Sequence, residues 1–239
     1  MGNVIARIAF SGGPKAGKTT IKEDTKKMIE EEYGFKVFLV PETATEIIEA
    51  GFIPSAKPKD GNKKKMNLFR RTNIAFQKMI LDLQIAKELA FEIAAQAVEE
   101  DVVIIYDRGI MDNKGYLMKN LGQVVGRIIF EMMIRRYRLT EEKINNRYDA
   151  VIILETIAKI KEFSKKVEND NTKRIESGNE EAIEVDNNVT EAWKNHKNRI
   201  IIKATETPEE KRDLTLDTVK GILNKKLEKT QARKLTKKI

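Results

Sequence analysis

One short stretch near the start of the chain limits the possible folds more than any other. Residues 10–20 read FSGGPKAGKTT and fit the pattern G-x-x-x-x-G-K-S/T. An apolar run from Val4 to Ser11 comes before the pattern, and a helical stretch from about Thr19 to Glu32 follows it. A strand, a glycine-rich loop and a helix in this order predict an α/β fold with a parallel sheet.

The pattern also indicates what the loop binds. Glycines let the backbone curl so that its N–H groups point at phosphate oxygens, and the following helix adds its positive end. Lys18 can reach the β- and γ-phosphates, and the Thr19 hydroxyl can ligate Mg²⁺. We therefore expect a P-loop NTPase fold that binds ATP and Mg²⁺. The expected nucleotide-binding residues are Gly12, Gly13, Pro14, Lys15, Ala16, Gly17, Lys18, Thr19 and Thr20.

Four further apolar runs complete the expected sheet, which has five parallel strands with helices on both faces. They are Lys36–Val40, Asp101–Asp107, Ala150–Glu155 and Arg199–Ala204. Helical patterns fill the gaps, at about 67–100, 122–138, 159–168, 180–195 and 208–231. The longest of them predicts a buried face because apolar residues recur at three- and four-residue spacing. These residues are Phe76, Met79, Ile80, Leu83, Ala86, Ala90, Ile93, Ala94 and Ala97.

Composition limits the domain organisation and the cellular compartment that we expect for the protein. The 239 residues, 41% of them hydrophobic, suffice for one domain over 1–231, with a basic loop at 53–65, a lid at 168–181 and a basic tail at 232–239. The absence of cysteine excludes disulfides and thiolate metal sites. We expect a cytoplasmic protein without a membrane partner, because no signal peptide and no run of about 18 apolar residues is present.

The net charge of +8 favours anionic partners, although solvated surface lysines explain much of it. Nucleic acid is the weaker of these partners, because no aromatic platform accompanies the lysines. The oligomeric state is left open.

Three candidate groups follow the expected strands. Asp107 ends the run VVIIYD, so it should lie at the carboxyl edge of the sheet, where it can hold Mg²⁺ together with Thr19. Arg108 follows directly and can contact the phosphate that is transferred. Glu42 follows the second strand, where it is either a general base or a carboxylate that favours a helix N-terminus.

Several patches together resemble a known group of proteins. FSGGPKAGKTT, VPETATEII, FQKMILDLQIAKE, YDRGIMD, YDAVIILE, NTKRIES and WKNH occur in this order over about 4–224. The chain resembles P-loop kinase-like ATP-binding domains of the ribosylnicotinamide-kinase and nucleoside-kinase type. It is also similar to the kinase-like domain that some eukaryotic proteins fuse to a CYTH triphosphate-tunnel domain, although the chain ends without one.

The resemblance implies roles for single residues. Lys18 and Thr19 match the phosphate and Mg²⁺ groups, and Asp107 with Arg108 match the acidic residue and its arginine after the third strand. The resemblance also favours Glu42 as the base, with Asp107 as the alternative. Arg174 matches the lid arginine, whereas the residues alone favour an ordinary exposed side chain.

We therefore expect phosphoryl transfer from ATP to a nucleoside- or nucleotide-like small molecule. A regulatory ATPase that acts through a protein or nucleic-acid partner is the alternative. A GTPase is disfavoured, because no Asn-Lys-x-Asp motif is present, although the donor nucleotide is not fixed further. We expect Lys18→Ala and Asp107→Ala each to abolish turnover and to leave the fold intact.

Overall fold

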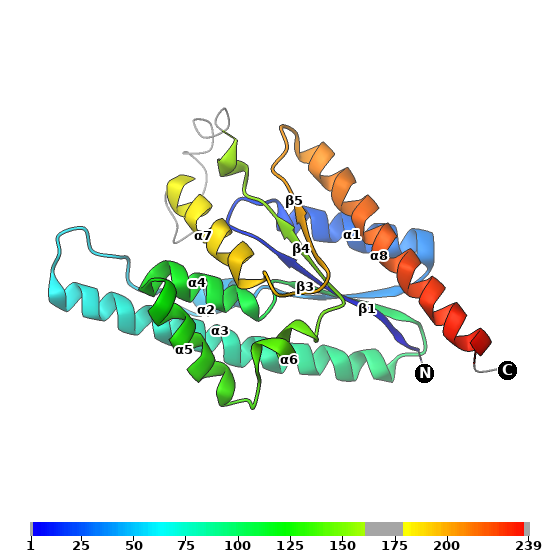
Figure 1. Ribbon diagram of the computed structural model, residues 1–239, viewed down its shortest axis with the longest axis horizontal. Helices are drawn as coiled ribbons and strands as arrows, with labels where there is room; N and C mark the ends of the chain where they lie inside the picture. Colours follow the sequence, from blue (N-terminus) through cyan, green and yellow to red (C-terminus); the bar gives the residue numbers. More distant parts are fainter. Residues whose placement is uncertain (1, 161–178, 237–239) are drawn as a thin grey trace.

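A computed structural model of the chain describes residues 2–160 and 179–236. Its centre is a sheet of five parallel strands in the order β2-β3-β1-β4-β5 (Figure 1). The strands are β1 (Val4–Ser11), β2 (Lys36–Val40), β3 (Val102–Asp107), β4 (Ala150–Leu154) and β5 (Arg199–Ile202). The expected five-stranded parallel sheet is confirmed, with strand ends that differ from the prediction by two residues at most.

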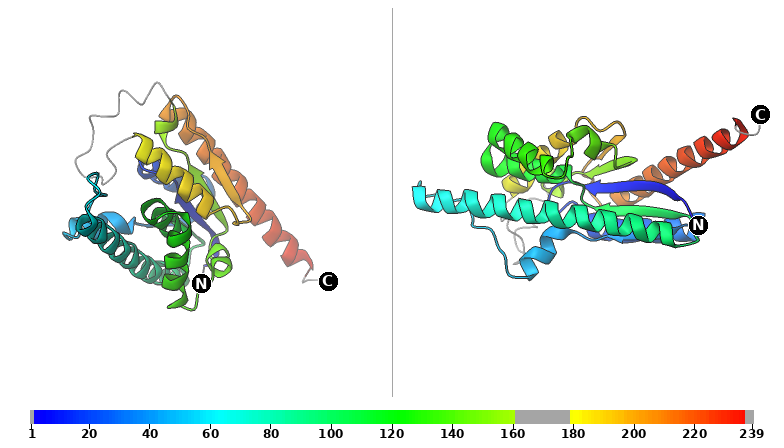
Figure 2. Two further views of the ribbon diagram at one scale, coloured as in Figure 1. Left: turned by 60° about the vertical axis from the view of Figure 1, so that its left-hand side comes forward. Right: turned by 90° about the horizontal axis from the view of Figure 1, so that it is seen from below.

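Helices cover both faces of this sheet, as expected (Figures 1 and 2). One face packs against α1 (Lys18–Tyr33) and α8 (Pro208–Thr236), which continues past the expected domain end at residue 231. The other face packs against four helices, α3 (Lys63–Ala97), α4 (Met111–Leu121), α5 (Gln123–Arg135) and α7 (Asn179–Ala192). Within the described residues, no helix is long and apolar enough to cross a membrane.

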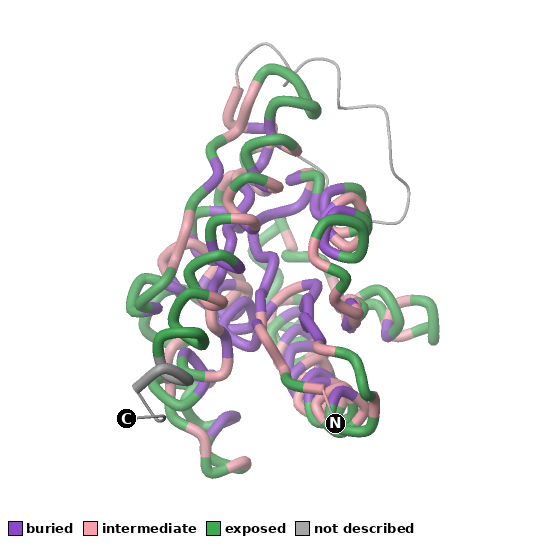
Figure 3. The backbone as a smooth tube through the Cα atoms, turned by 90° about the vertical axis from the view of Figure 1, so that its right-hand side faces the viewer, coloured by how far each residue is buried: buried purple, intermediate pink, exposed green. Residues whose placement is uncertain are grey.

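The central strands form the core because their side chains are apolar on both faces. In β3, Val102, Ile104 and Tyr106 contribute to one apolar cluster, and Val103 and Ile105 contribute to the other. This division follows from the two-residue period of a strand. Figure 3 shows the buried strands enclosed by helices whose outer sides are exposed.

Three short elements and one helix were not expected from the sequence. They are α2 (Thr43–Glu49), α6 (Glu141–Asn145), the 3-10 helix η1 (Ile157–Lys159) and α4. The helix expected at 159–168 lies outside the described residues from position 161 onward. Of the expected lid at 168–181, only residues 179–181 are described, and they form the first turn of α7.

Helix α3 begins earlier than expected and shortens the basic loop. The side chain of Asn62 caps the helix by accepting a hydrogen bond from the Lys65 backbone N–H at 3.1 Å. Lys63, Lys64 and Lys65 therefore belong to the first turn of α3, and the connection from α2 ends at Asn62.

The sequence-based prediction of which face of α3 is buried is wrong. Phe76 is buried as expected, but Met79, Leu83 and Ile93 are exposed. The helix instead buries a face with four polar side chains, those of Asn73, Gln77, Gln84 and Glu88. Burial of polar groups is tolerated where hydrogen bonds compensate it, and Glu88 pairs with Arg147 and accepts from the Tyr148 hydroxyl. Apolar spacing alone could not reveal such a face.

The parallel register fixes the position of the functional groups. Phe10 in β1 lies beside Asp107 in β3, and the Arg108 N–H donates to the Phe10 carbonyl at 2.9 Å. The loops that follow β1 and β3 therefore leave the same edge of the sheet side by side. In open parallel sheets, this carboxyl edge is where ligands bind.

The packing of Trp193 explains why a glycine, Gly109, follows Arg108. A Cβ atom on Gly109 would lie 2.5 Å from Cζ2 of Trp193, which is fully buried. The indole leaves no room for any side chain at position 109, so the glycine of the Asp-Arg-Gly sequence is required by packing.

We predict that Gly109→Ala destabilises the protein by about 1–3 kcal/mol, because overpacking a core costs this much. The matched control is Gly221→Ala in α8, where a Cβ atom meets nothing within 4 Å. This control should stabilise the protein by up to about 1 kcal/mol, because glycine disfavours a helix interior. Urea unfolding of the two variants and the parent measures both effects. Equal stability of Gly109→Ala and the parent would contradict the packing argument.

Candidate active site

The phosphate loop connects β1 to α1 and depends on glycine geometry. Gly12 has φ of 125°, and a Cβ atom there would lie 2.1 Å from the Leu154 carbonyl oxygen in β4. Gly17 has φ of 80° and forms the N-cap of α1. Both conformations are rare for other residues. The structure therefore supports the sequence prediction that this segment is a phosphate-binding loop.

Three side chains from distant elements hold the backbone of this loop. Asp186 in α7 accepts a hydrogen bond from the Gly13 N–H at 2.8 Å. Thr156 donates to the Pro14 carbonyl at 2.7 Å, and Lys211 in α8 donates to the Ala16 carbonyl at 2.9 Å. Asp186 is fully buried and forms an ion pair with Lys159 at 2.7 Å. The loop is thus held in shape from both faces of the sheet.

Lys18 lies inside this loop as the pattern predicts. Its Nζ atom donates to the carbonyl oxygens of Gly12 at 3.1 Å and Gly13 at 2.8 Å. Burial and, to a lesser degree, the nearby charge of Arg108 together lower the pKa of the Lys18 amine to about 8, although the surrounding carboxylates oppose this shift. The lysine is therefore close to losing its charge at mildly alkaline pH.

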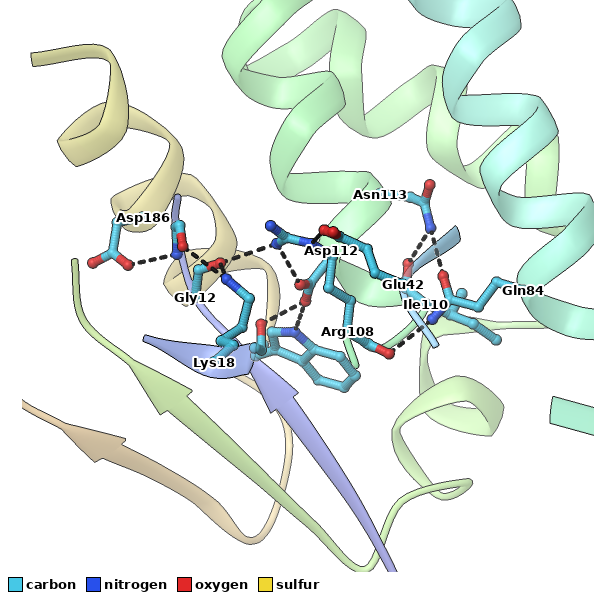
Figure 4. A network of polar contacts seen from close by, with 12 residues as sticks. Gly12, Lys18, Glu42, Gln84, Arg108, Ile110, Asp112, Asn113 and Asp186 are labelled. Atoms are coloured by element: carbon cyan, nitrogen blue, oxygen red, sulfur yellow. Dashed lines mark hydrogen bonds and ion pairs between the residues drawn. The ribbon is translucent and has the colours of Figure 1, made fainter. Parts of the chain in front are cut away.

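Arg108 is the centre of the site (Figure 4). Its Nε atom donates to Glu42, and its Nη1 atom donates to the Gly12 carbonyl at 3.0 Å. It also pairs with Asp112 at 3.3 Å and lies 5.3 Å from the centre of the Tyr116 ring. Its φ of 78° is rare for a residue with a side chain, which marks a strained position often found at functional sites. The guanidinium group therefore joins three separate loops.

Glu42 reaches the site from the end of β2. Burial disfavours its charge, but the positive charges of Arg108 and Lys18 outweigh this effect and lower the pKa of Glu42 to about 2. The group is consequently a carboxylate at neutral pH. It also stands at the N-cap of α2, although its side chain makes no capping hydrogen bond there. Ion pairing with Arg108 therefore accounts for its position better than interaction with the helix end does.

Asp112 is a site residue that sequence reasoning missed. Its carboxylate accepts from the Ser11 hydroxyl and the Trp193 indole N–H, both at 2.6 Å, and it pairs with Arg108. Burial raises the pKa of Asp112 even though Arg108 opposes this shift. The sequence offered one signal for Asp112. It lies four residues after Arg108, at the start of α4, where the two side chains can pair.

The proposed metal ligands fit magnesium by chemistry. Thr19 offers a hydroxyl oxygen, and the buried carboxylate of Asp107 pairs with Lys22 in α1. Magnesium is commonly held by one or two protein oxygens and by substrate phosphates, so this pair suffices. Within residues 2–160 and 179–236, no group of three or more His, Cys, Asp or Glu side chains could hold a metal ion. Arg174 lies outside the described residues.

The polar face of α3 closes the far side of the site. Gln84 donates to the Arg108 carbonyl at 3.0 Å, and Asn113 in α4 donates to the Gln84 side-chain oxygen at 3.3 Å (Figure 4). The oxygen atoms Oε1 of Gln77 and Oδ1 of Asn113 are buried without a hydrogen-bond partner among the described residues. This wall is therefore built from amides rather than from aliphatic side chains.

Two further residues that the sequence did not reveal contact the phosphate loop from helices far along the chain. Asp186 and Lys211 meet the phosphate loop only through the folding of α7 and α8, and no local motif marks them. His196, the single histidine of the sequence, is buried with Nε2 3.0 Å from the Tyr148 carbonyl oxygen, so it has a structural contact.

A comparison with known families shows to which family the chain belongs. A family model described as an AAA domain matches residues 7–211, which is most of the sequence. The chain belongs to this AAA-domain family. The resemblance to P-loop kinase-like domains is thereby confirmed. A comparison with curated proteins gives no match.

Solved structures share the fold. A deoxyadenosine kinase from M. mycoides with bound dATP is 18% identical with a TM-score of 0.55, and the similarity covers 90% of this chain and 99% of the other. A structure of deoxyadenosine kinase from M. mycoides with the products dCMP and a flexible dCDP is 19% identical with a TM-score of 0.53 and the same coverage. The chain therefore shares the α/β P-loop fold of these structures.

We predict that nucleotide affinity weakens as the pH rises through about 8, because the free Lys18 amine loses its proton there. Phosphate binding favours the charged amine, so the dissociation constant for ATP should rise by up to about tenfold per pH unit above that pKa. Isothermal titration calorimetry between pH 7 and 9.5 measures this dependence.

Lys18→Met is the control for this measurement. The variant keeps Lys211, whose pKa burial also lowers to about 8, and it experiences the same ionisation of ATP. The difference between the two pH profiles therefore belongs to Lys18. Parallel profiles for the parent and Lys18→Met would show that the amine does not titrate in this range.

We predict that Arg108→Met costs about 3–5 kcal/mol of folding stability, because it leaves the buried carboxylate of Asp112 and the half-buried carboxylate of Glu42 without their cation. Arg212→Met is the control, since Arg212 pairs at the surface with its neighbour Asp213, where solvent screening leaves such a pair little effect on stability. Chemical unfolding measures both variants. A loss for Arg108→Met as small as that of the control would show that the carboxylates do not depend on Arg108.

Proposed function

We propose that the protein is a kinase that transfers the γ-phosphoryl group of ATP, with Mg²⁺, to a nucleoside- or nucleotide-like small molecule. The observation that carries this proposal is the contact of Arg108 with Glu42 on one side and with the Gly12 carbonyl on the other. A carboxylate and an arginine that lie directly beside a phosphate loop suit the transfer of a phosphoryl group to a hydroxyl.

The residues supply positioning and charge. The acceptor oxygen forms a bond to the γ-phosphorus while the bond from this phosphorus to the ADP oxygen breaks. The acceptor proton passes to Glu42, which is ionised at neutral pH. Lys18 and Arg108 offset the negative charge that develops on the phosphoryl oxygens. Thr19 and Asp107 would hold Mg²⁺, which supplies Lewis-acid stabilisation of the phosphate charge.

The amide wall of α3 and α4 supports an acceptor with several hydrogen-bonding groups. Gln84 contacts Arg108 and is joined to Asn113, and amide groups pair well with the donors and acceptors of a nucleobase or sugar. Deoxyadenosine kinase shares this fold, which supports a nucleoside-like acceptor.

A second space supports the binding of the donor nucleotide. A cavity of about 260 Å³ opens on the outer side of the phosphate loop, between α1, η1 and the start of α8. Lys15, Gly17, Asp24, Lys211 and Arg212 line it. We assign this cavity to the nucleoside half of ATP, because it adjoins the loop on the side away from Glu42 and α3.

Terminally labelled ATP tests the proposed function. We expect label on one acceptor when the protein is incubated with Mg²⁺ and deoxynucleosides, ribonucleosides, nucleoside monophosphates, ribosylnicotinamide or 5′-hydroxyl RNA. Lys18→Ala should reduce transfer by about 100- to 1,000-fold, because loss of one preorganised group that stabilises developing charge costs this much. Lys27→Ala, an exposed lysine of the same helix, should retain full transfer.

Asp107→Asn serves as a second variant, because it keeps the buried shape that Asp107→Ala would lose. It should abolish transfer with an unchanged melting curve. Label that appears only as slow free phosphate, for every acceptor, would overturn the kinase assignment in favour of a regulatory ATPase. Full transfer by Lys18→Ala would remove the assignment of the site itself.

A further inference from the structure

The carboxylate that we assign to the metal ion already has a cationic partner. The Nζ atom of Lys22 in α1 forms an ion pair with Oδ2 of Asp107 at the end of β3. The Lys22 side chain is 13% exposed and that of Asp107 is 6% exposed, so both are largely shielded from water. Lys22 follows Thr19 by three residues, which places both on one side of the helix. The lysine therefore contacts one of the two groups proposed to hold Mg²⁺ and neighbours the other.

The burial of this ion pair makes it matter for the site. Ion pairs at the surface contribute little, because water and salt screen them. Removing the cation from a buried pair is costly, because the carboxylate is then left without a compensating charge in a medium of low dielectric constant. Lys22 therefore stabilises the charge of Asp107.

The neighbouring charges of the site are balanced in the same way. Arg108 pairs with Glu42 and with Asp112, and the partner of Asp107 is Lys22. A divalent cation beside Asp107 would repel the ammonium group, and such repulsion is strong at short range in a buried site. The flexible four-carbon stem of lysine allows the ammonium group to move away. A metal ion can therefore use the Asp107 carboxylate only when Lys22 withdraws from it.

We propose that Lys22 is a positioning residue that competes with Mg²⁺ for Asp107 and keeps the divalent cation out of the site until ATP is bound. The inference rests on the proposed function, because it takes Thr19 and Asp107 as the metal ligands. Magnesium is commonly held by one or two carboxylates together with substrate phosphates. The phosphates of ATP supply the oxygen ligands and the negative charge that make displacement of the ammonium group favourable, whereas the free protein supplies neither.

Manganese binding to the protein without nucleotide tests this competition. Electron paramagnetic resonance of unbound Mn²⁺ gives the affinity and needs no enzyme activity. We expect Lys22→Met to bind Mn²⁺ at least about tenfold more tightly than the parent, because the buried carboxylate then lacks a cation. The double variant Lys22→Met/Asp107→Asn should return to the weak binding of the parent. Lys27→Met, which removes an exposed lysine of the same helix, is the matched control and should bind as the parent does.

Melting curves add a second measurement and show whether the variants fold. Mn²⁺ should raise the melting temperature of Lys22→Met and leave those of the parent and Lys27→Met unchanged, because a ligand stabilises the folded chain that binds it. Lys22→Gln gives up the charge but keeps a hydrogen-bond donor for Asp107. It replaces Lys22→Met in both measurements if the methionine variant does not fold.

Two results would overturn the inference. One is equal Mn²⁺ affinity of the parent and of the variant without the Lys22 charge. The other is a double variant that binds Mn²⁺ as tightly as Lys22→Met does. Failure of the proposed function is seen separately, in the transfer of label from ATP. A parent that transfers label while its Mn²⁺ affinity does not depend on Lys22 contradicts the competition alone. A parent that transfers no label to any acceptor contradicts the kinase assignment.

Discussion

The site depends on one buried cation. Arg108 neutralises Glu42 and Asp112, which reach it from the end of β2 and the start of α4, and it also contacts the phosphate loop at Gly12. The buried charge of Asp112 in particular would be strongly disfavoured without Arg108. The same cation lowers the pKa of Lys18. The positions of three loops and the charge state of Lys18 are therefore coupled through a single side chain.

This coupling explains why the helices around the site are polar where they are buried. Gln84 holds the carbonyl of Arg108, and Asp112 is held by Ser11 and Trp193. These two buried polar groups are favourable because their partners lie within hydrogen-bonding distance, and they would be costly without those partners. The interior of this side of the sheet is consequently specified by hydrogen bonds as well as by apolar packing.

The sheet and the phosphate loop could be predicted because their signals are local. Lys18 follows a glycine pattern, and Asp107 ends an apolar strand, so their places follow from a few neighbouring residues. The buried face of α3 could not be predicted, because Gln84 and Glu88 are buried by partners far along the chain. Asp112 and Asp186 were missed for the same reason. An apolar pattern identifies the apolar side of a helix, but it does not tell whether the sheet covers that side.

The register between β1 and β3 distinguishes changes in segment length that the chain cannot accept from changes that it can. Insertion or deletion of one residue in β3 would turn Asp107 to the opposite side of the sheet, because side chains alternate along a strand. Doubling the length of the connection before α3, residues 50–62, would cost only about 0.6 kcal/mol in closure entropy. The groups at the carboxyl edge of the sheet are thus tied to strand lengths that cannot vary, whereas the connection before α3 can lengthen at little cost. A fold of this kind can change the surroundings of its site through its loops and keep the site itself.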